Sequence, residues 1–226
     1  MSTHDVSRRN FLATAGGGAL AAATVSVQGA AQTQEPAKRG SQRLSPRQLE
    51  AWEKLGYGMF IHYGMSTYVQ NELPDGKAPA TAYAPDKLDV AQWISVARDA
   101  GMKYAVLTTK HVAGHCLWPT KHTDYSVVNS GDKTDVVERF VTACRDKGVL
   151  PGFYYCSWDN HNRFGSRTWS DGGEPFFTTS LYQTFQTAQI TELLTQYGPI
   201  AEMWVDIPGV LGRGYRTFLY NYIAGL

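Results

Sequence analysis

The residues best suited to chemistry lie where a short apolar stretch ends on a carboxylate. The stretch from Pro199 to Asp206 follows a helix stop and alternates with period two, which places Glu202, Trp204 and Asp206 on one face. Asp206 then lies at the carboxyl end of a strand, where parallel α/β proteins place catalytic groups. An indole beside a carboxylate suits a sugar site, because the ring packs on the apolar face of a pyranose and the carboxylate meets its anomeric carbon. An aspartate before a Pro-Gly turn is also a common way to end a strand.

Two histidines are predicted at the same level as this carboxylate. His62 and His111 each fall at the end of an apolar stretch that reads as a strand, and neutral imidazoles can hydrogen-bond sugar hydroxyls. His111 and His115 have the i, i+4 spacing of some zinc ligands, but Gly114 disfavours a helix and no glutamate follows the first histidine. A ligand set of His62, His111 and Asp206 keeps a metal-dependent hydrolase as an alternative.

The elements that must position these residues follow one repeated pattern. A capped amphipathic helix, a glycine stop and a short apolar strand occur four times after a polar linker. The helices are predicted to begin at Ser45, Asp89, Asp135 and Ser180, and the strands cover residues 58–63, 104–109, 149–156 and 199–206. A further helix is expected at 215–224. Tyr154 and Tyr155 are adjacent, so only one of them can face the same side as Asp206.

Apolar strands alternating with helices predict a parallel sheet covered by helices. Because each crossover is right-handed, four in succession curve the same way, which favours a TIM-like (β/α) barrel over the runner-up, a doubly wound sheet. A whole barrel takes about 250 residues, and four βα units are visible here, so we expect a barrel truncated after about four units over residues 45–226. The long connections after the strands all lie at one rim, where barrels build their pockets.

Composition narrows the function mainly by exclusion. The 226 residues are 43% hydrophobic and 18% charged with a formal net charge of +1, which suits one globular domain and gives no reason to expect nucleic acid or an anionic membrane as partner. The three cysteines have no metal-ligand spacing, and no glycine fingerprint after a strand indicates a dinucleotide cofactor. We expect Cys144 to face the core, and Cys116 and Cys156 to act as small hydrophobic residues.

The first residues read as an export signal. Ser7-Arg8-Arg9-Asn10-Phe11-Leu12 precedes an Ala- and Gly-rich apolar run, and Gly29-Ala30-Ala31 gives a small-residue cleavage site. We expect a twin-arginine signal peptide at residues 1–31 and a linker at 32–44. The partner during export is then the twin-arginine translocase. We expect the mature protein to be periplasmic or extracellular, with no membrane attachment after cleavage.

Several ordered motifs resemble the α-L-fucosidases of glycoside hydrolase family 29. They are Gly58-Met59-Phe60-Ile61-His62-Tyr63-Gly64, Leu107-Thr108-Thr109-Lys110-His111, Leu117-Trp118-Pro119-Thr120-Lys121-His122-Thr123-Asp124, Gly152-Phe153-Tyr154-Tyr155, and Tyr197-Gly198-Pro199-Ile200 leading to Trp204-Val205-Asp206. The resemblance covers about residues 44–209. It implies a (β/α) barrel, no metal and a retaining mechanism.

The resemblance also implies roles for single residues. Asp206 falls on the nucleophile, and His62, His111, Tyr154 and Trp204 fall on residues that hold the fucose. The family usually continues Lys-His with a second histidine, where this chain has Val112, and His115 is a candidate replacement. In the family the acid/base comes from farther along than residue 226, so we expect this chain to lack it. The alternative from another class is a non-catalytic fucose-binding relative.

Overall fold

The computed structural model describes residues 44–163 and 177–226, which lie within one compact unit, Gly40–Leu226. The strands are β1 (Met59–Ile61), β2 (Tyr104–Lys110), β3 (Leu150–Cys156) and β4 (Glu202–Asp206). The α-helices are α1 (Pro46–Glu53), α2 (Met65–Val69), α3 (Val90–Asp99), α4 (Val136–Lys147), α5 (Ser180–Gln196) and α6 (Arg213–Ala224). The predicted signal peptide and nearly all of the predicted linker lie outside the described residues. Within residues 44–163 and 177–226, no helix is long and apolar enough to cross a bilayer.

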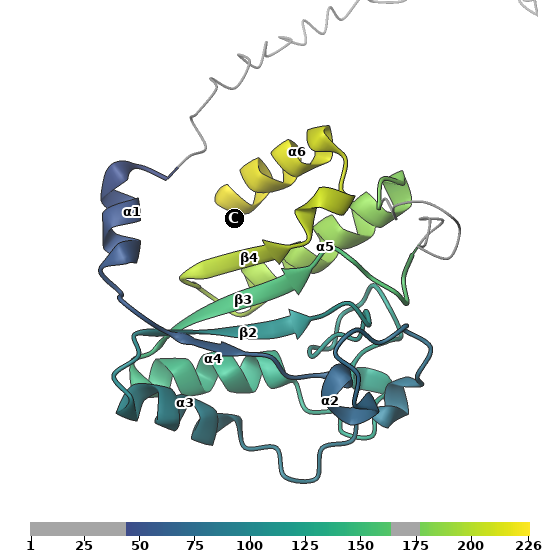
Figure 1. Ribbon diagram of the computed structural model, residues 1–226, viewed down its shortest axis with the longest axis horizontal. Helices are drawn as coiled ribbons and strands as arrows, with labels where there is room; N and C mark the ends of the chain where they lie inside the picture. Colours follow the sequence, from purple (N-terminus) through teal and green to yellow (C-terminus); the bar gives the residue numbers. More distant parts are fainter. Residues whose placement is uncertain (1–43, 164–176) are drawn as a thin grey trace, which may run out of the picture. The chain divides into compact units, whose positions relative to one another are not determined.

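The four strands form one parallel sheet in the order β1-β2-β3-β4. Their arrowheads point the same way in Figure 1, toward the end where α2 and the long loops lie. Every crossover therefore steps to the next strand in sequence, whereas a doubly wound sheet reverses direction at its middle. This winding confirms the predicted partial (β/α) barrel, and the doubly wound runner-up was wrong. β1 and β4 are the edge strands of the described sheet.

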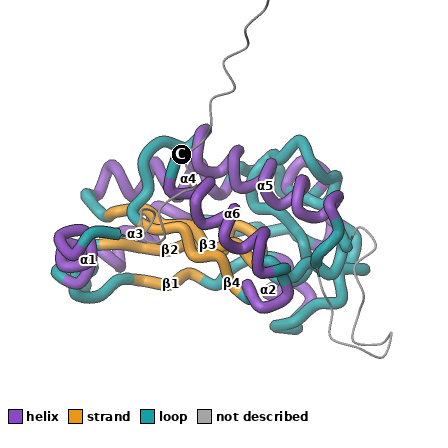
Figure 2. The backbone as a smooth tube through the Cα atoms, turned by 90° about the horizontal axis from the view of Figure 1, so that it is seen from above, coloured by secondary structure: helices purple, strands orange, loops and turns teal. Residues whose placement is uncertain are grey.

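The two faces of the sheet differ in what covers them. Leu107, Phe153 and Tyr155 join the main hydrophobic core together with residues of α3, α4 and α5. Figure 2 shows α4 and α5 on the same side of the strands. Val106, Tyr154 and Cys156 belong to a second, smaller cluster. Because neighbouring residues of a strand point to opposite faces, this second face is the inner face of the partial barrel.

The predicted helix starts follow from side-chain caps. Ser45 and Gln48 form a reciprocal capping box, and Asp89 and Asp135 each accept a hydrogen bond from a backbone N–H in the first turn. The α4 helix ends at Gly148, whose φ of 68° lies in the left-handed region that glycine adopts without strain. For α5 the predicted cap, Ser180, is the first helical residue, and the side chain that caps the helix is that of Thr179.

Other boundaries also differ from the prediction, since β4 begins at Glu202 and not at residue 199, and β2 and β3 each differ by one residue. The β1 strand is three residues long, where residues 58–63 were expected. It ends early because the Thr108 hydroxyl accepts the N–H of Tyr63 at 3.0 Å, which takes that group out of the backbone ladder. The last helix begins at Arg213, two residues before the predicted start. Cys144 is buried in the core as expected, and Cys116 and Cys156 are buried and free.

Candidate active site

Asp206 ends β4 with both carboxylate oxygens engaged. The Tyr154 hydroxyl donates to Asp206 Oδ2 at 2.6 Å, and the Ile207 N–H donates to Oδ1 at 2.8 Å. Tyr154 pairs with Trp204 across the sheet, and Cys156 pairs with Asp206, so these side chains share the inner face. One donor from β3 and one from the residue after β4 therefore fix the plane of this carboxylate. Ile207 itself has φ 50°, ψ 45°, a left-handed conformation that is strained for a β-branched residue.

The two predicted histidines lie next to each other on this face. The ring centroids of His62 and His111 are 4.3 Å apart, and the His111 ring is 5.8 Å from that of Tyr154. His62 is exposed and His111 is half-buried. Since Tyr154 also bonds Asp206, a continuous set of contacts runs from β1 to β4. The structure thus brings His62, His111, Tyr154 and Asp206 together at the carboxyl ends of four strands, and this group is called the cup below.

Two aromatic rings extend the cup toward the centre of the barrel. Trp204 is 41% exposed although it is a large apolar side chain, and its ring lies 5.3 Å from that of Tyr154. Phe60 is 46% exposed and lies 5.0 Å from Trp204 and 5.5 Å from Tyr154. Sequence reasoning missed Phe60. Its signal was the same period-two rule, because a strand that turns His62 inward also turns Phe60 inward.

The remaining predicted histidine, His115, lies apart from these contacts. Its side chain is 3% exposed, its Nε2 is 2.8 Å from the Ser130 hydroxyl, and its ring lies between those of Tyr83 and Tyr125. The loop histidines are engaged in the same way. His161 stacks on Tyr125 with ring centroids 4.0 Å apart, and His122 lies 3.4 Å from Glu192. These side chains hold the rim loops together.

The carboxyl groups near the rim differ in availability. Asp159 is fully buried and bonded to Lys110, and Glu202 pairs with Gly152 at the start of β4, far along the strand from Asp206. Glu72 is exposed on the loop after β1, while Glu174 lies outside the described residues. Among residues 44–163 and 177–226, no group of three or more His, Cys, Asp or Glu side chains is placed to hold a metal ion.

Burial sets the protonation of the site. Burial, together with the neighbouring His62, lowers the pKa of His111 to about 4, although Asp206 opposes the shift. Burial and the hydrogen bond to Asp206 raise the pKa of Tyr154, so its hydroxyl keeps its proton and remains a donor. At neutral pH the cup therefore presents a neutral His111 imidazole. The Nδ1 of His111 is buried and has no hydrogen-bond partner in the described part of the chain.

These shifts predict a stability loss in mild acid. Burial also lowers the pKa of His115 to about 4. Each imidazole takes up a proton near pH 6.5 when unfolded but only near pH 4 when folded, so the unfolded state binds more protons between these values. Stability is full above that window and falls as pH drops through it, by about 1.4 kcal/mol per pH unit for each histidine. Urea unfolding at about pH 7, 6 and 5 measures the slope. His111→Asn and His115→Asn should each flatten this slope, and a slope as steep in either variant as in the unmodified chain would contradict the assignment to that histidine.

The chain is similar to known proteins over the region that carries most of these site residues. The family model for α-L-fucosidase matches residues 75–213. The chain is 36% identical over 181 residues to alpha-L-fucosidase 1 of Arabidopsis thaliana, covering 79% of this chain and 33% of that protein. A glycoside hydrolase 29 family member from an unknown rumen bacterium has 35% identity and a TM-score of 0.63, covering 71% of this chain and 27% of that one.

A third relative has been solved as a trapped covalent intermediate. It is a GH29 α-L-fucosidase from Bacteroides thetaiotaomicron in complex with 2-fluoro-fucosyl fluoride. It has 27% identity and a TM-score of 0.58, covering 73% of this chain and 42% of that one. The chain spans about a third of the length of the first curated relatives that it matches. The matched region includes most of the cup, and the chain belongs to the α-L-fucosidase family.

Proposed function

We propose that this chain is part of an exported retaining glycoside hydrolase that releases terminal α-L-fucose from glycans or glycoconjugates. The observation that carries the proposal is the placement of Asp206 in one open cup with His62, His111 and Trp204. The family membership supports the substrate class, and the covalent intermediate of a relative supports a retaining route.

Asp206 acts as the nucleophile in this proposal. Its carboxylate attacks the anomeric carbon, the bond to the leaving-group oxygen breaks, and that oxygen takes a proton from a general acid. Water then attacks the fucosyl ester, the proton returns to the same acid, and fucose leaves with its original configuration. The hydrogen bonds from Tyr154 and Ile207 hold the carboxylate toward the sugar before the first step.

The other cup residues bind the sugar. His111 is neutral and half-buried, so its imidazole can hydrogen-bond a fucose hydroxyl, and His62 is exposed beside it. Trp204 and Phe60 offer apolar ring faces to the hydrophobic side of the fucose ring. We leave His115 out of this set because Ser130, Tyr83 and Tyr125 enclose it.

The general acid is the part of the proposal supplied from elsewhere. A retaining enzyme needs a second carboxyl group about 5–5.5 Å from the nucleophile. Asp159 is fully buried and bonded to Lys110, and Glu202 lies at the opposite end of its strand from Asp206. Glu72 is exposed on the loop after β1, but we place the acid outside the residues described here, as the resemblance to the family implies. We also propose that Arg8 and Arg9 direct export by the twin-arginine route, which gives a periplasmic or extracellular protein.

Covalent trapping tests the nucleophile without depending on the acid. In 2-fluoro-fucosyl fluoride the fluoride leaves with little proton assistance, and the ring fluorine slows hydrolysis of the ester. We expect the chain to gain one 2-fluorofucosyl group, located by peptide mass spectrometry on Asp206. Asp206→Asn should stay unmodified.

Other outcomes of the trapping experiment, together with assays of L-fucose binding and of fucoside hydrolysis, decide between the alternatives. An adduct on another carboxylate would overturn the assignment of Asp206. No adduct, together with saturable binding of L-fucose, would favour a non-catalytic binding protein. Fucoside hydrolysis that a chelator abolishes would favour the metal-dependent hydrolase.

A further inference from the structure

The β2 strand carries a register shift just before His111. Thr108 pairs with Tyr154, but Lys110 pairs with Tyr155, so Thr109 is an extra residue opposite a single step of β3. Such an insertion is a β-bulge, and it reverses the side to which every later side chain of the strand points. The bulge lies directly before the histidine that the cup needs.

Without the bulge, the strand would present the wrong residue to the cup. Val106 lies in the inner cluster with Tyr154, so strict alternation would continue inward through Thr108 to Lys110. His111 would then point to the helix-covered side. The observed chain does the reverse, because the Lys110 ammonium lies 4.3 Å from the ring centroid of Tyr155, which belongs to the outer core. His111 instead contacts His62 and Tyr154.

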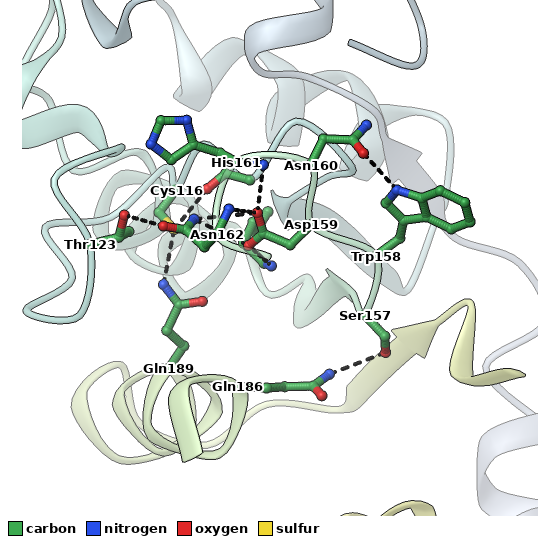
Figure 3. A network of polar contacts seen from close by, with 12 residues as sticks. Cys116, Thr123, Ser157, Trp158, Asp159, Asn160, His161, Asn162, Gln186 and Gln189 are labelled. Carbon is green, nitrogen blue, oxygen red and sulfur yellow. Dashed lines mark hydrogen bonds and ion pairs between the residues drawn. The ribbon is translucent and has the colours of Figure 1, made fainter. Parts of the chain in front are cut away.

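A buried ion pair fixes Lys110 in this position. Lys110 Nζ lies 2.7 Å from Asp159 Oδ2, and both side chains are fully buried. The other oxygen, Oδ1, accepts the N–H groups of His161 at 3.1 Å and Asn162 at 2.7 Å. Figure 3 shows Asp159 enclosed by these two residues in the loop after β3. Backbone groups of the loop after β3 therefore fix the Asp159 carboxylate in position, and its other oxygen pairs with Lys110 of β2.

The hydroxyl groups of Thr108 and Thr109 also hold the bulge in place by hydrogen bonds. Thr109 donates to the Tyr154 carbonyl at 2.8 Å, and Thr108 donates to the Tyr63 carbonyl at 2.8 Å. The bulge is thus bonded to β3 on one side and to the chain after β1 on the other. Removing two charges from water is costly, and apolar residues can often replace a buried pair without loss of stability. A buried pair at this point is therefore better explained by the backbone conformation of the bulge than by stability.

We propose that the bulge at Thr109 turns His111 into the cup and that Lys110 and Asp159 are the positioning residues that hold it there. The importance of His111 for sugar binding rests on the function proposed above, while its orientation does not. Neither Lys110 nor Asp159 touches the sugar in this arrangement. Their effect reaches the sugar only through the backbone of residues 109–111.

Proton NMR contacts between rings test the orientation directly. The chain should show nuclear Overhauser effects from His111 to His62 and Tyr154. Lys110→Met keeps the aliphatic stem over Tyr155 but leaves Asp159 unpaired, and we expect these effects to disappear and L-fucose to bind at least about tenfold more weakly. Lys110→Arg, which keeps the charge, should restore part of both signals. Lys54→Met removes the exposed pair with Glu50 and should change neither.

A double variant keeps the test decisive if Lys110→Met does not fold. Lys110→Met with Asp159→Asn leaves no buried charge unpaired, so it should fold and still lose the contacts of His111. Unchanged ring contacts in a folded variant of either kind, with only a lower melting temperature, would overturn the proposal. If the unmodified chain shows the ring contacts but no L-fucose binding, the proposed function fails and the positioning role stands.

Discussion

Asp206→Ala is expected to slow the release of phenol from an activated aryl α-L-fucoside by at least about 10³-fold. The reason is that Asp206 is the carboxylate of the cup, where Tyr154 and Ile207 hold it. The proposed reaction needs this group to attack the anomeric carbon. A good leaving group needs little proton assistance, so the assay reports on the nucleophile alone. Initial rates measured with the same substrate before and after substitution give the ratio.

Azide provides the matching rescue experiment for Asp206→Ala. The small cavity left by the carboxylate admits the anion, which attacks the anomeric carbon and expels the phenolate, and the product is a fucosyl azide of inverted configuration. Asp99→Asn, at the exposed end of α3, is the control and should keep the full rate. Equal rates for Asp206→Ala and the unmodified chain would remove Asp206 from the mechanism.

Gly114→Ala is expected to lower the free energy of unfolding by about 3–5 kcal/mol. Gly114 has φ +87°, and a Cβ there would lie 2.2 Å from Asp159 Oδ1. That oxygen cannot move away cheaply, because Lys110, His161 and Asn162 hold the carboxylate. The substitution therefore disturbs the buried ion pair as well as the backbone.

Two other glycines separate these effects. Gly101 has φ +80° with nothing within 4 Å of its added Cβ, so Gly101→Ala reports the backbone effect alone, about 1–2 kcal/mol. Gly209 also has open space and no positive φ, and its alanine variant should stay within about 0.5 kcal/mol of the unmodified chain. Urea unfolding of all three variants makes the comparison. A loss for Gly114→Ala no larger than for Gly101→Ala would show that the approach to Asp159 is tolerated.

Local signals explain why much of this fold was predictable. Ser45, Asp89 and Asp135 cap helices through bonds within one turn, and an apolar run before Asp206 can lie in few ways other than as a strand. Because parallel strands end at one edge, strand ends alone predict that His62, His111 and Asp206 meet. These inferences need only neighbours in sequence and the rule of winding.

The features that sequence reasoning missed depend on contacts between distant residues. The bulge at Thr109 is specified by Asp159, 49 residues after the Lys110 that it pairs with, and no periodicity in β2 reveals it. The spacing of His115 suggested a ligand, but its surroundings come from Ser130, Tyr83 and Tyr125, which the loops bring together. The end of β1 depends in the same way on the hydroxyl of Thr108 in the next strand.

In the described part of the chain, β1 and β4 are the outer strands of the sheet, and this links the face proposed to bind sugar to self-association. Each edge offers a row of backbone groups that a strand from a second molecule can pair with, and Phe60 and Trp204 lie on these same two strands. Pairing of two molecules along β4 would place a second chain beside Trp204, the ring proposed to pack on fucose. Sugar and a second copy would then compete for one surface, so the apparent affinity for fucose would weaken as the protein is concentrated.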